Sequence, residues 1–230
     1  MTEKNDKVLV KQLMQQMSGV GFCLLTNVEG HDEETLLTAI KAFHELPLEV
    51  KMKMAPKHYK GAENNENTYQ GYFPFLQGDV SLKEFYSLPR PYEEISDWER
   101  DGCPLYEPLS WTPDQKYDWI LKRFQKHWKV MHTFAMKLNR LFALGLGKPL
   151  NYFDPWFKDE CTSTCRTIHY ISREEEGADP AEYKLVTPEH PDSGFITLLT
   201  TFMFSGLEVL IDGEYKPIKP IKNAIIVNLG

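Results

Sequence analysis

A histidine and an aspartate near the end of the chain have the residue types and spacing of a metal-ligand pair. One proline separates His190 from Asp192, so in an extended strand both side chains point to the same face. An imidazole and a carboxylate are two of the three groups in the facial triad that holds non-haem Fe(II). An isolated His-x-Asp is more often a surface accident, so the surrounding sequence has to decide.

The residues that follow the pair predict short antiparallel strands. Residues 195–204 form an apolar run rich in β-formers, and two further strands are predicted over 206–210 and 224–229. Asp212-Gly213 predicts a hairpin turn, because glycine adopts positive φ without strain. A metal pair just ahead of several such strands is typical of a jelly roll that carries its ligands at the mouth.

Four segments of this region carry a specific resemblance: HPDSGFITLL, GLEV, DGEYKPI and AIIVNLG. They resemble the iron- and 2-oxoglutarate-dependent dioxygenases of the isopenicillin N synthase-like family, and the resemblance covers nearly the whole chain. It implies an α+β fold with a double-stranded β-helix (jelly roll) core, an N-terminal helical region and a long backing helix. It also implies that Fe(II) binds His190 and Asp192, with no catalytic residue beyond the metal ligands. The cofactors it implies are Fe(II) and 2-oxoglutarate, with ascorbate as a further candidate.

An arginine and a tyrosine are the candidate cosubstrate ligands. A strand is expected over 163–171, and within it Arg166 to Tyr170 resembles the family's R-x-x-x-Y segment. The resemblance implies that Tyr170 faces the cavity and that Tyr170 and Arg166 bind a carboxylate of the cosubstrate or the substrate. Their even spacing allows both to face one side of the strand. The alternative is a tyrosine that fills the barrel and an arginine that pairs at its rim, and it stays open.

The N-terminal half predicts alternating helices and strands without chemistry of its own. His44 is interpreted as a core or interface histidine, and Lys51 as part of a solvated basic helix face. The expected elements are a helix over 7–17, a buried strand over 21–28, a helix from Asp32 to Pro47, a surface loop over 57–75 and a strand over 83–86.

A long helix is predicted to begin at Thr112, where threonine, proline and glutamine form a capping box, and to continue to Gly145. It would back the jelly roll. We expect a single domain over 1–230, with a dioxygenase-type N-terminal region over 1–110. Residues 111–230 would hold the long helix and a partial jelly roll.

Composition limits the classes of partner. The 230 residues carry a net charge of −7 and are 42% hydrophobic, which favours a folded globule over a nucleic-acid or membrane-surface binder. No apolar run approaches the ~20 residues that span a bilayer. The four cysteines lack zinc-ligand spacing, and a reducing cytoplasm is the expected compartment. The expected partner is a small-molecule substrate, and the oligomeric state is left open.

Two groups that the resemblance requires are missing from the sequence. Residues 191–230 contain no histidine and no arginine, whereas the family binds iron with a second histidine and 2-oxoglutarate with an arginine after it. We therefore expect a chain truncated at both ends, without the last strands of the roll. The function expected is hydroxylation or desaturation of a small organic molecule. The alternative is an inactive relative or truncated isoform that keeps a binding or regulatory role.

Overall fold

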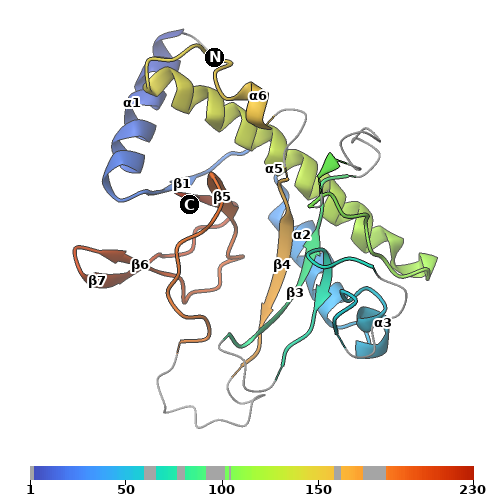
Figure 1. The fold of residues 1–230 in the computed structure, drawn as a ribbon. Coiled ribbons are helices and arrows are strands. Elements are labelled where there is room, and N and C mark those ends of the chain that lie inside the picture. Colours follow the sequence, from blue (N-terminus) through green and yellow to red (C-terminus); the bar gives the residue numbers. More distant parts are fainter. Residues whose placement is uncertain are drawn as a thin grey trace. The chain divides into compact units, whose positions relative to one another are not determined.

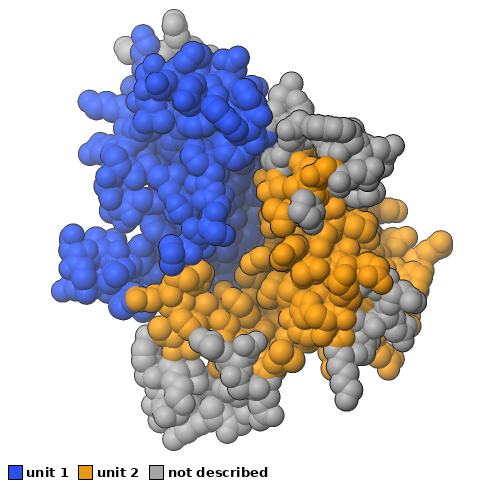
Figure 2. Space-filling model, viewed as in Figure 1, with its two compact units in different colours: residues 1–37, 129–159, 191–230 blue, residues 38–128, 160–190 orange. Residues whose placement is uncertain are grey.

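The computed structural model describes residues 3–59, 66–76, 81–91, 102–103, 105–157, 162–172 and 185–230. The chain divides into two compact units, coloured separately in Figure 2. Unit 1 comprises residues 1–37, 129–159 and 191–230, and unit 2 comprises residues 38–128 and 160–190. Each unit is assembled from distant parts of the sequence and is described by itself. The prediction of a single domain, with its boundary near residue 110, stays a prediction.

Unit 1 contains a three-stranded antiparallel sheet. Its strands are β1 (Phe22–Leu25), β8 (Ile225–Leu229) and β5 (Ile196–Leu199), in that order across the sheet. The strands predicted over 21–28 and 224–229 are thus confirmed, with shorter bounds, but the first is not buried as expected, because the residues of β1 are half-buried or exposed. β8 is the central strand, and its apolar residues are the most buried part of the sheet, as the strand of a half-buried sheet with neighbours on both sides should be.

Helices cover this sheet and form the core of unit 1. α1 (Glu3–Gly19) confirms the first predicted helix, and α5 (Asp118–Gly145) contributes its C-terminal half. A Cβ added at Gly145 would lie 2.3 Å from the Met14 side chain, so a larger residue there would require that side chain to move. The buried core side chains come from α1, α5 and β8: Leu13, Met17, Leu138, Phe142, Ile225 and Val227.

The remaining strands of unit 1 form a separate hairpin, visible in Figure 1. β6 (Glu208–Ile211) and β7 (Glu214–Pro217) pair across Asp212 and Gly213, whose φ values are 52° and 80°. Two successive positive φ values are those of a type I′ turn, which matches the twist of the flanking strands. The predicted Asp-Gly hairpin is confirmed.

The strand predicted over 195–204 is too long. β5 ends at Leu199, and the chain then turns, with Phe202 and Met203 at φ values of 49° and 67°. These values lie in the left-handed region, which cannot continue a strand. The apolar, β-favouring composition of the run did not reveal this turn.

Unit 2 contains a second antiparallel sheet of three strands, with β3 in the middle. They are β2 (Gly71–Phe73), β3 (Lys83–Leu88) and β4 (Cys165–Tyr170), and Figure 1 shows the β3–β4 pair. β3 and β4 confirm two predicted strands. The expected surface loop over 57–75 is wrong in its last part, because β2 pairs with β3 and Tyr72 is buried.

One face of this sheet packs on an aromatic cluster. Tyr86 of β3 lies 4.9 Å from Phe43 and 5.5 Å from Trp111, measured between ring centroids. Phe124 of α5 completes the cluster at 5.9 Å from Phe43. Aromatic side chains bury large areas and dominate the energetics of such a core. The cluster fixes β3, and with it Glu84, two residues before Tyr86 and on the same face.

Two helices begin where short acidic side chains cap them. Asp32 accepts a hydrogen bond from the Thr35 amide at 3.1 Å, which confirms the predicted cap of α2 (Glu33–His44). The predicted helix start at Thr112 is displaced. Asp114 caps a 3₁₀ turn, η2 (Gln115–Tyr117), and α5 follows it. The short helix α3 (Leu48–Met52) contains Lys51, which was expected on a helix face, whereas the short helix α6 (Asp154–Phe157) was not predicted. Among the described helices, none has the length and hydropathy to cross a membrane.

Candidate functional site

The Asp192 carboxylate is held by two side chains of the unit 1 sheet. Asp192 is half-buried in the irregular segment before β5. Its Oδ2 accepts a hydrogen bond from the Thr197 hydroxyl at 2.7 Å and from the Asn228 amide at 2.8 Å. Thr197 and Asn228 are direct partners in the register of β5 and β8. Both donors are neutral, so they orient the carboxylate without neutralising its charge.

His190 is exposed and lies at the end of the last segment of unit 2. Its Nδ1 lies 2.9 Å from the carbonyl oxygen of Pro188. A carbonyl can only accept, so Nδ1 carries the proton, and in the neutral imidazole the lone pair is on Nε2. Metal-binding histidines are commonly held in this way, with the second ring nitrogen donating to a carbonyl.

These two side chains fit a divalent metal by their chemistry. One offers a lone pair on Nε2, and the other offers an oriented carboxylate, which are ligand types of non-haem Fe(II) sites. Both residues lie ahead of β5 and outside the regular strands, as the sequence placed them. The boundary between the two units falls between His190 and Pro191, so each residue is described within its own unit.

Arg166 and Tyr170 lie four residues apart on β4, in unit 2, and both are exposed. Their even spacing places them on one face of the sheet. The Arg166 guanidinium lies 5.1 Å from the centroid of the Phe85 ring on β3, a cation–π contact. Partial burial raises the pKa of the Tyr170 phenol above its ordinary value. The predicted carboxylate-binding role of the two residues stays a prediction.

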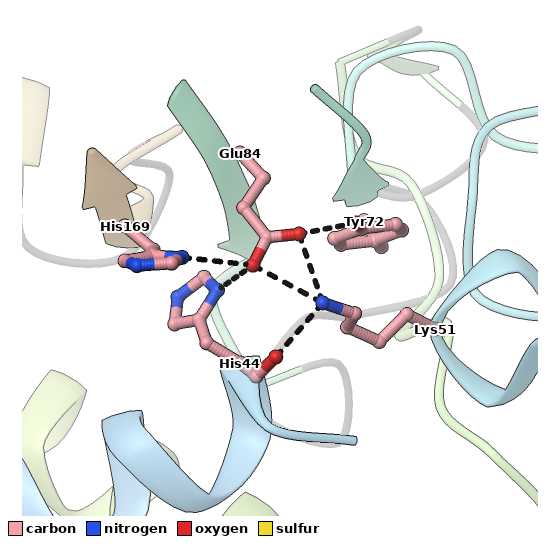
Figure 3. A network of polar contacts seen from close by, with 5 residues as sticks. All are labelled: His44, Lys51, Tyr72, Glu84 and His169. Carbon is pink, nitrogen blue, oxygen red and sulfur yellow. Dashed lines mark hydrogen bonds and ion pairs between the residues drawn. The ribbon is translucent and has the colours of Figure 1, made fainter. Parts of the chain in front are cut away.

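A second polar cluster lies in unit 2 around Glu84 of β3 (Figure 3). We call it the Glu84 hub, and its members come from five elements: His44, Lys51, Tyr72, Glu84 and His169. Lys51 Nζ lies 3.1 and 2.9 Å from the two Glu84 oxygens, and it also donates to the His44 carbonyl at 2.9 Å. His44 and His169 direct Nδ1 at Glu84 Oε1 at 2.9 and 3.2 Å. The Tyr72 hydroxyl donates to Glu84 Oε2.

The hub is buried, and its partners stabilise Glu84 as a carboxylate. The side chains of His44, Lys51 and Glu84 are 5%, 7% and 8% exposed. Burial alone would raise the pKa of Glu84, but the hydrogen bonds from His44, Tyr72 and Lys51 hold that pKa well below its ordinary value. Burial lowers the pKa of His44 despite the attraction of Glu84. Burial, followed by the contact with Glu84, raises the pKa of Tyr72.

The hub contains the residue types of a metal site, but it also contains the positive charge of Lys51. Within the described part of the chain, one ligand atom each from His44, Glu84 and His169 lies within 4.8 Å of the others. Lys51, however, already contacts both oxygens of Glu84, so a metal ion would share this carboxylate with an ammonium group. The ion pair of Lys51 with Glu84 makes the hub a buried ion network. The positive charge of Lys51 disfavours a second cation there.

The hub was missed at the level of sequence, although one signal was present. The interpretation of His44 as a core histidine is confirmed, but that of Lys51 as a solvated residue is wrong, because it is buried. In the β3 sequence, Glu84, Tyr86 and Leu88 share one face. An acid on the face that carries Tyr86 and Leu88 indicates a buried, partnered carboxylate.

Comparison of the sequence with known proteins gives consistent relatives. Residues 1–114 match the family model described as the N-terminal region of the non-haem dioxygenase in morphine synthesis. Isopenicillin N synthase from Amycolatopsis lactamdurans is 27% identical over 99% of this chain and 70% of its own length. Gibberellin 20 oxidase 4 from Arabidopsis thaliana is also 27% identical, over 98% of this chain and 58% of its own length.

The fold has a similar counterpart among solved structures. A full-length protein from Neurospora crassa, crystallised in complex with alpha-KG and thymine, gives a TM-score of 0.80 at 22% sequence identity. The likeness covers 100% of this chain and 70% of the Neurospora crassa chain, and at this identity it concerns the fold. The family-model match and the two enzyme relatives support a place for the chain in the isopenicillin N synthase-like family of iron- and 2-oxoglutarate-dependent dioxygenases.

Proposed function

We propose that this chain functions as an Fe(II)- and 2-oxoglutarate-dependent oxygenase, with His190 and Asp192 as two of the iron ligands. The observation that carries the proposal is that hydrogen bonds orient both proposed ligands. His190 donates Nδ1–H to the Pro188 carbonyl, which leaves the lone pair on Nε2. Asp192 is oriented by two neutral donors. The H-P-D sequence at 190–192 also resembles the metal motif of the family.

The reaction we propose is hydroxylation or desaturation of a small organic molecule. When bound, iron and 2-oxoglutarate supply the activation of O2 and the electrons for its reduction, with ascorbate as an accessory reductant. The chain's own residues bind and orient. Arg166 and Tyr170, on one face of β4, would hold a carboxylate of the cosubstrate or the substrate. The crystallised complex of the Neurospora crassa protein with thymine supports a small-molecule substrate.

Two further proposals concern the fold and the compartment. The fold would have a double-stranded β-helix core, which the likeness to the Neurospora crassa structure supports. The compartment would be the cytoplasm, because the four cysteines lack the pattern of a disulfide framework.

The direct test is metal binding by the 230-residue chain, with Mn(II) as an Fe(II) substitute that resists oxidation. Free Mn(II) is followed by its electron paramagnetic resonance signal during a titration. We expect weak but measurable binding that His190→Ala and Asp192→Ala each abolish. Glu189→Gln is the matched control, since Glu189 is an exposed neighbour of the pair. If both alanine variants bind Mn(II) like the parent, the assignment of the ligands is wrong.

The alternative function is that of a non-catalytic relative, which keeps the fold for binding or regulation without turnover. Release of succinate from 2-oxoglutarate, with Fe(II) and ascorbate present, separates the two functions. Succinate above the level of Asp192→Ala supports the oxygenase, and metal binding without succinate supports the non-catalytic relative.

A further inference from the structure

The two donors to Asp192 come from directly opposed positions of two neighbouring strands. Thr197 of β5 is the register partner of Asn228 of β8, and opposed residues of an antiparallel pair have Cβ atoms about 4.5–5.5 Å apart. Their donor atoms, Thr197 Oγ1 and Asn228 Nδ2, reach the same oxygen of Asp192 at 2.7 and 2.8 Å. A single strand register therefore aims two side chains at one carboxylate oxygen.

Asn228 lies on β8, the central strand of the unit 1 sheet, which pairs with a strand on each side. Asn228 is paired with Phe22 of β1 on one side and with Thr197 of β5 on the other. The preceding residues, Ile225 to Val227, are buried in the core, and Asn228 itself is only 7% exposed. A donor on a buried central strand loses little further conformational freedom when it binds the carboxylate.

We infer that Thr197 and Asn228 are positioning residues that hold the Asp192 carboxylate in a metal-binding orientation. Neither would contact the metal. The inference rests on the proposed function, because it takes Asp192 as an iron ligand. Hydrogen bonds from a hydroxyl and an amide fix the direction of the carboxylate, and neither donor is itself a cation. Residues that orient metal ligands in this way typically change metal affinity about 10–100-fold when they are removed.

Isosteric variants of the full 230-residue chain test the inference. Thr197→Val removes the hydroxyl and keeps the shape, and Asn228→Leu removes the amide donor at similar volume. Thr197→Ser restores the hydroxyl, and Thr26→Val is the control for the same change at an exposed residue of unit 1. The readouts are the Kd for Mn(II), the visible absorption spectrum of bound Co(II), and the thermal unfolding curve.

We expect Thr197→Val and Asn228→Leu to weaken Mn(II) binding about 10–100-fold and to alter the Co(II) spectrum. Thr197→Ser and Thr26→Val should keep the parent Kd and spectrum. A role that is only structural would lower the unfolding temperature without changing the Kd of the folded protein. If Asn228→Leu shows no cooperative unfolding transition, the positioning role is tested by comparing Thr197→Val with Thr197→Ser alone.

The outcomes separate this inference from the proposed function. If Asp192→Ala loses Mn(II) binding but Thr197→Val and Asn228→Leu bind like the parent, the positioning role is wrong and the ligand assignment stands. If Asp192→Ala binds like the parent, or the parent binds no Mn(II), the proposed site itself is wrong, and the positioning role with it.

Discussion

Glu84 and Asp192 are both carboxylates held by side chains from other strands, but the charges of their partners differ. Glu84 is buried and accepts from the ammonium of Lys51, from two imidazoles and from a phenol. Asp192 is half-buried and accepts from a hydroxyl and an amide. The first arrangement matches a buried negative charge with a positive one, whereas the hydroxyl and amide donors to Asp192 are neutral and orient the carboxylate.

This difference separates the structural carboxylate of Glu84 from the proposed ligand carboxylate of Asp192. The composition of the Glu84 hub, two histidines and an acid, would by itself suggest a metal site. The presence of Lys51 reverses that conclusion, because a buried ion pair and a bound cation compete for the same two oxygens. The residue types of a cluster therefore indicate its chemistry only when the charges around it are counted.

The largest expected effect is the loss of stability when the hub loses its carboxylate. Glu84→Gln keeps the shape but leaves Lys51 buried without a counter-charge, which costs about 3–5 kcal/mol of unfolding free energy. Chemical denaturation measures it. The control is Glu214→Gln, in the exposed pair with Lys216, where about 0.5 kcal/mol or less is expected. A loss below about 1 kcal/mol for Glu84→Gln would show that the hub is not a buried ion network.

Two tyrosines sharpen the comparison with smaller effects. Tyr72→Phe removes a donor to the buried Glu84 carboxylate and should cost about 1.5–3 kcal/mol, as hydrogen bonds to charged groups do. Tyr170, 48% exposed, should lose about 1 kcal/mol or less on the same change. Tyr170→Phe should instead weaken binding of 2-oxoglutarate or substrate. Unchanged binding constants for Tyr170→Phe would give this residue a structural role only.

Lowering the pH should gradually reduce the free energy of unfolding of unit 2. The pKa of Glu84 is held below its ordinary value of 4.5, so its stabilisation is present above that pH and is lost as the pH falls below it. Burial lowers the pKa of His44 from 6.5, so the unfolded chain takes up its proton first and stability also falls as the pH drops below 6.5. Each titrating proton contributes at most about 1.4 kcal/mol per pH unit.

Urea denaturation from about pH 8 to about pH 5 measures this slope. His44→Gln should flatten it between pH 6.5 and pH 5, while His58→Gln, at an exposed histidine, should leave it unchanged. A slope that His44→Gln does not alter would show that His44 is not the buried neutral group described above.

Local signals in the sequence were enough for much of the fold. The Asp32 cap, the Asp212-Gly213 turn and the apolar period of the long helix each depend on neighbours within a few residues, and each predicted its element. The errors came where distant residues decide. Lys51 is buried because Glu84, 33 residues later, accepts from it, and β2 exists because β3 pairs with it.

The candidate site was predictable in part for the same reason. Only one residue separates His190 from Asp192, so the pair can be recognised as a sequence motif. The donors that orient Asp192 were not recognised, because Asn228 is 36 residues away and reaches the carboxylate only through the register of β5 with β8. A one-residue shift of that register would turn Asn228 to the other face of the sheet.

The most direct test of the metal site compares two histidines in a single Mn(II) titration. His169→Gln changes the imidazole at the edge of the Glu84 hub, and His190→Gln changes the proposed ligand. We expect that His190→Gln abolishes Mn(II) binding and that His169→Gln retains the parent Kd. Retained binding in His190→Gln together with lost binding in His169→Gln would contradict this expectation, and would place the metal at the hub.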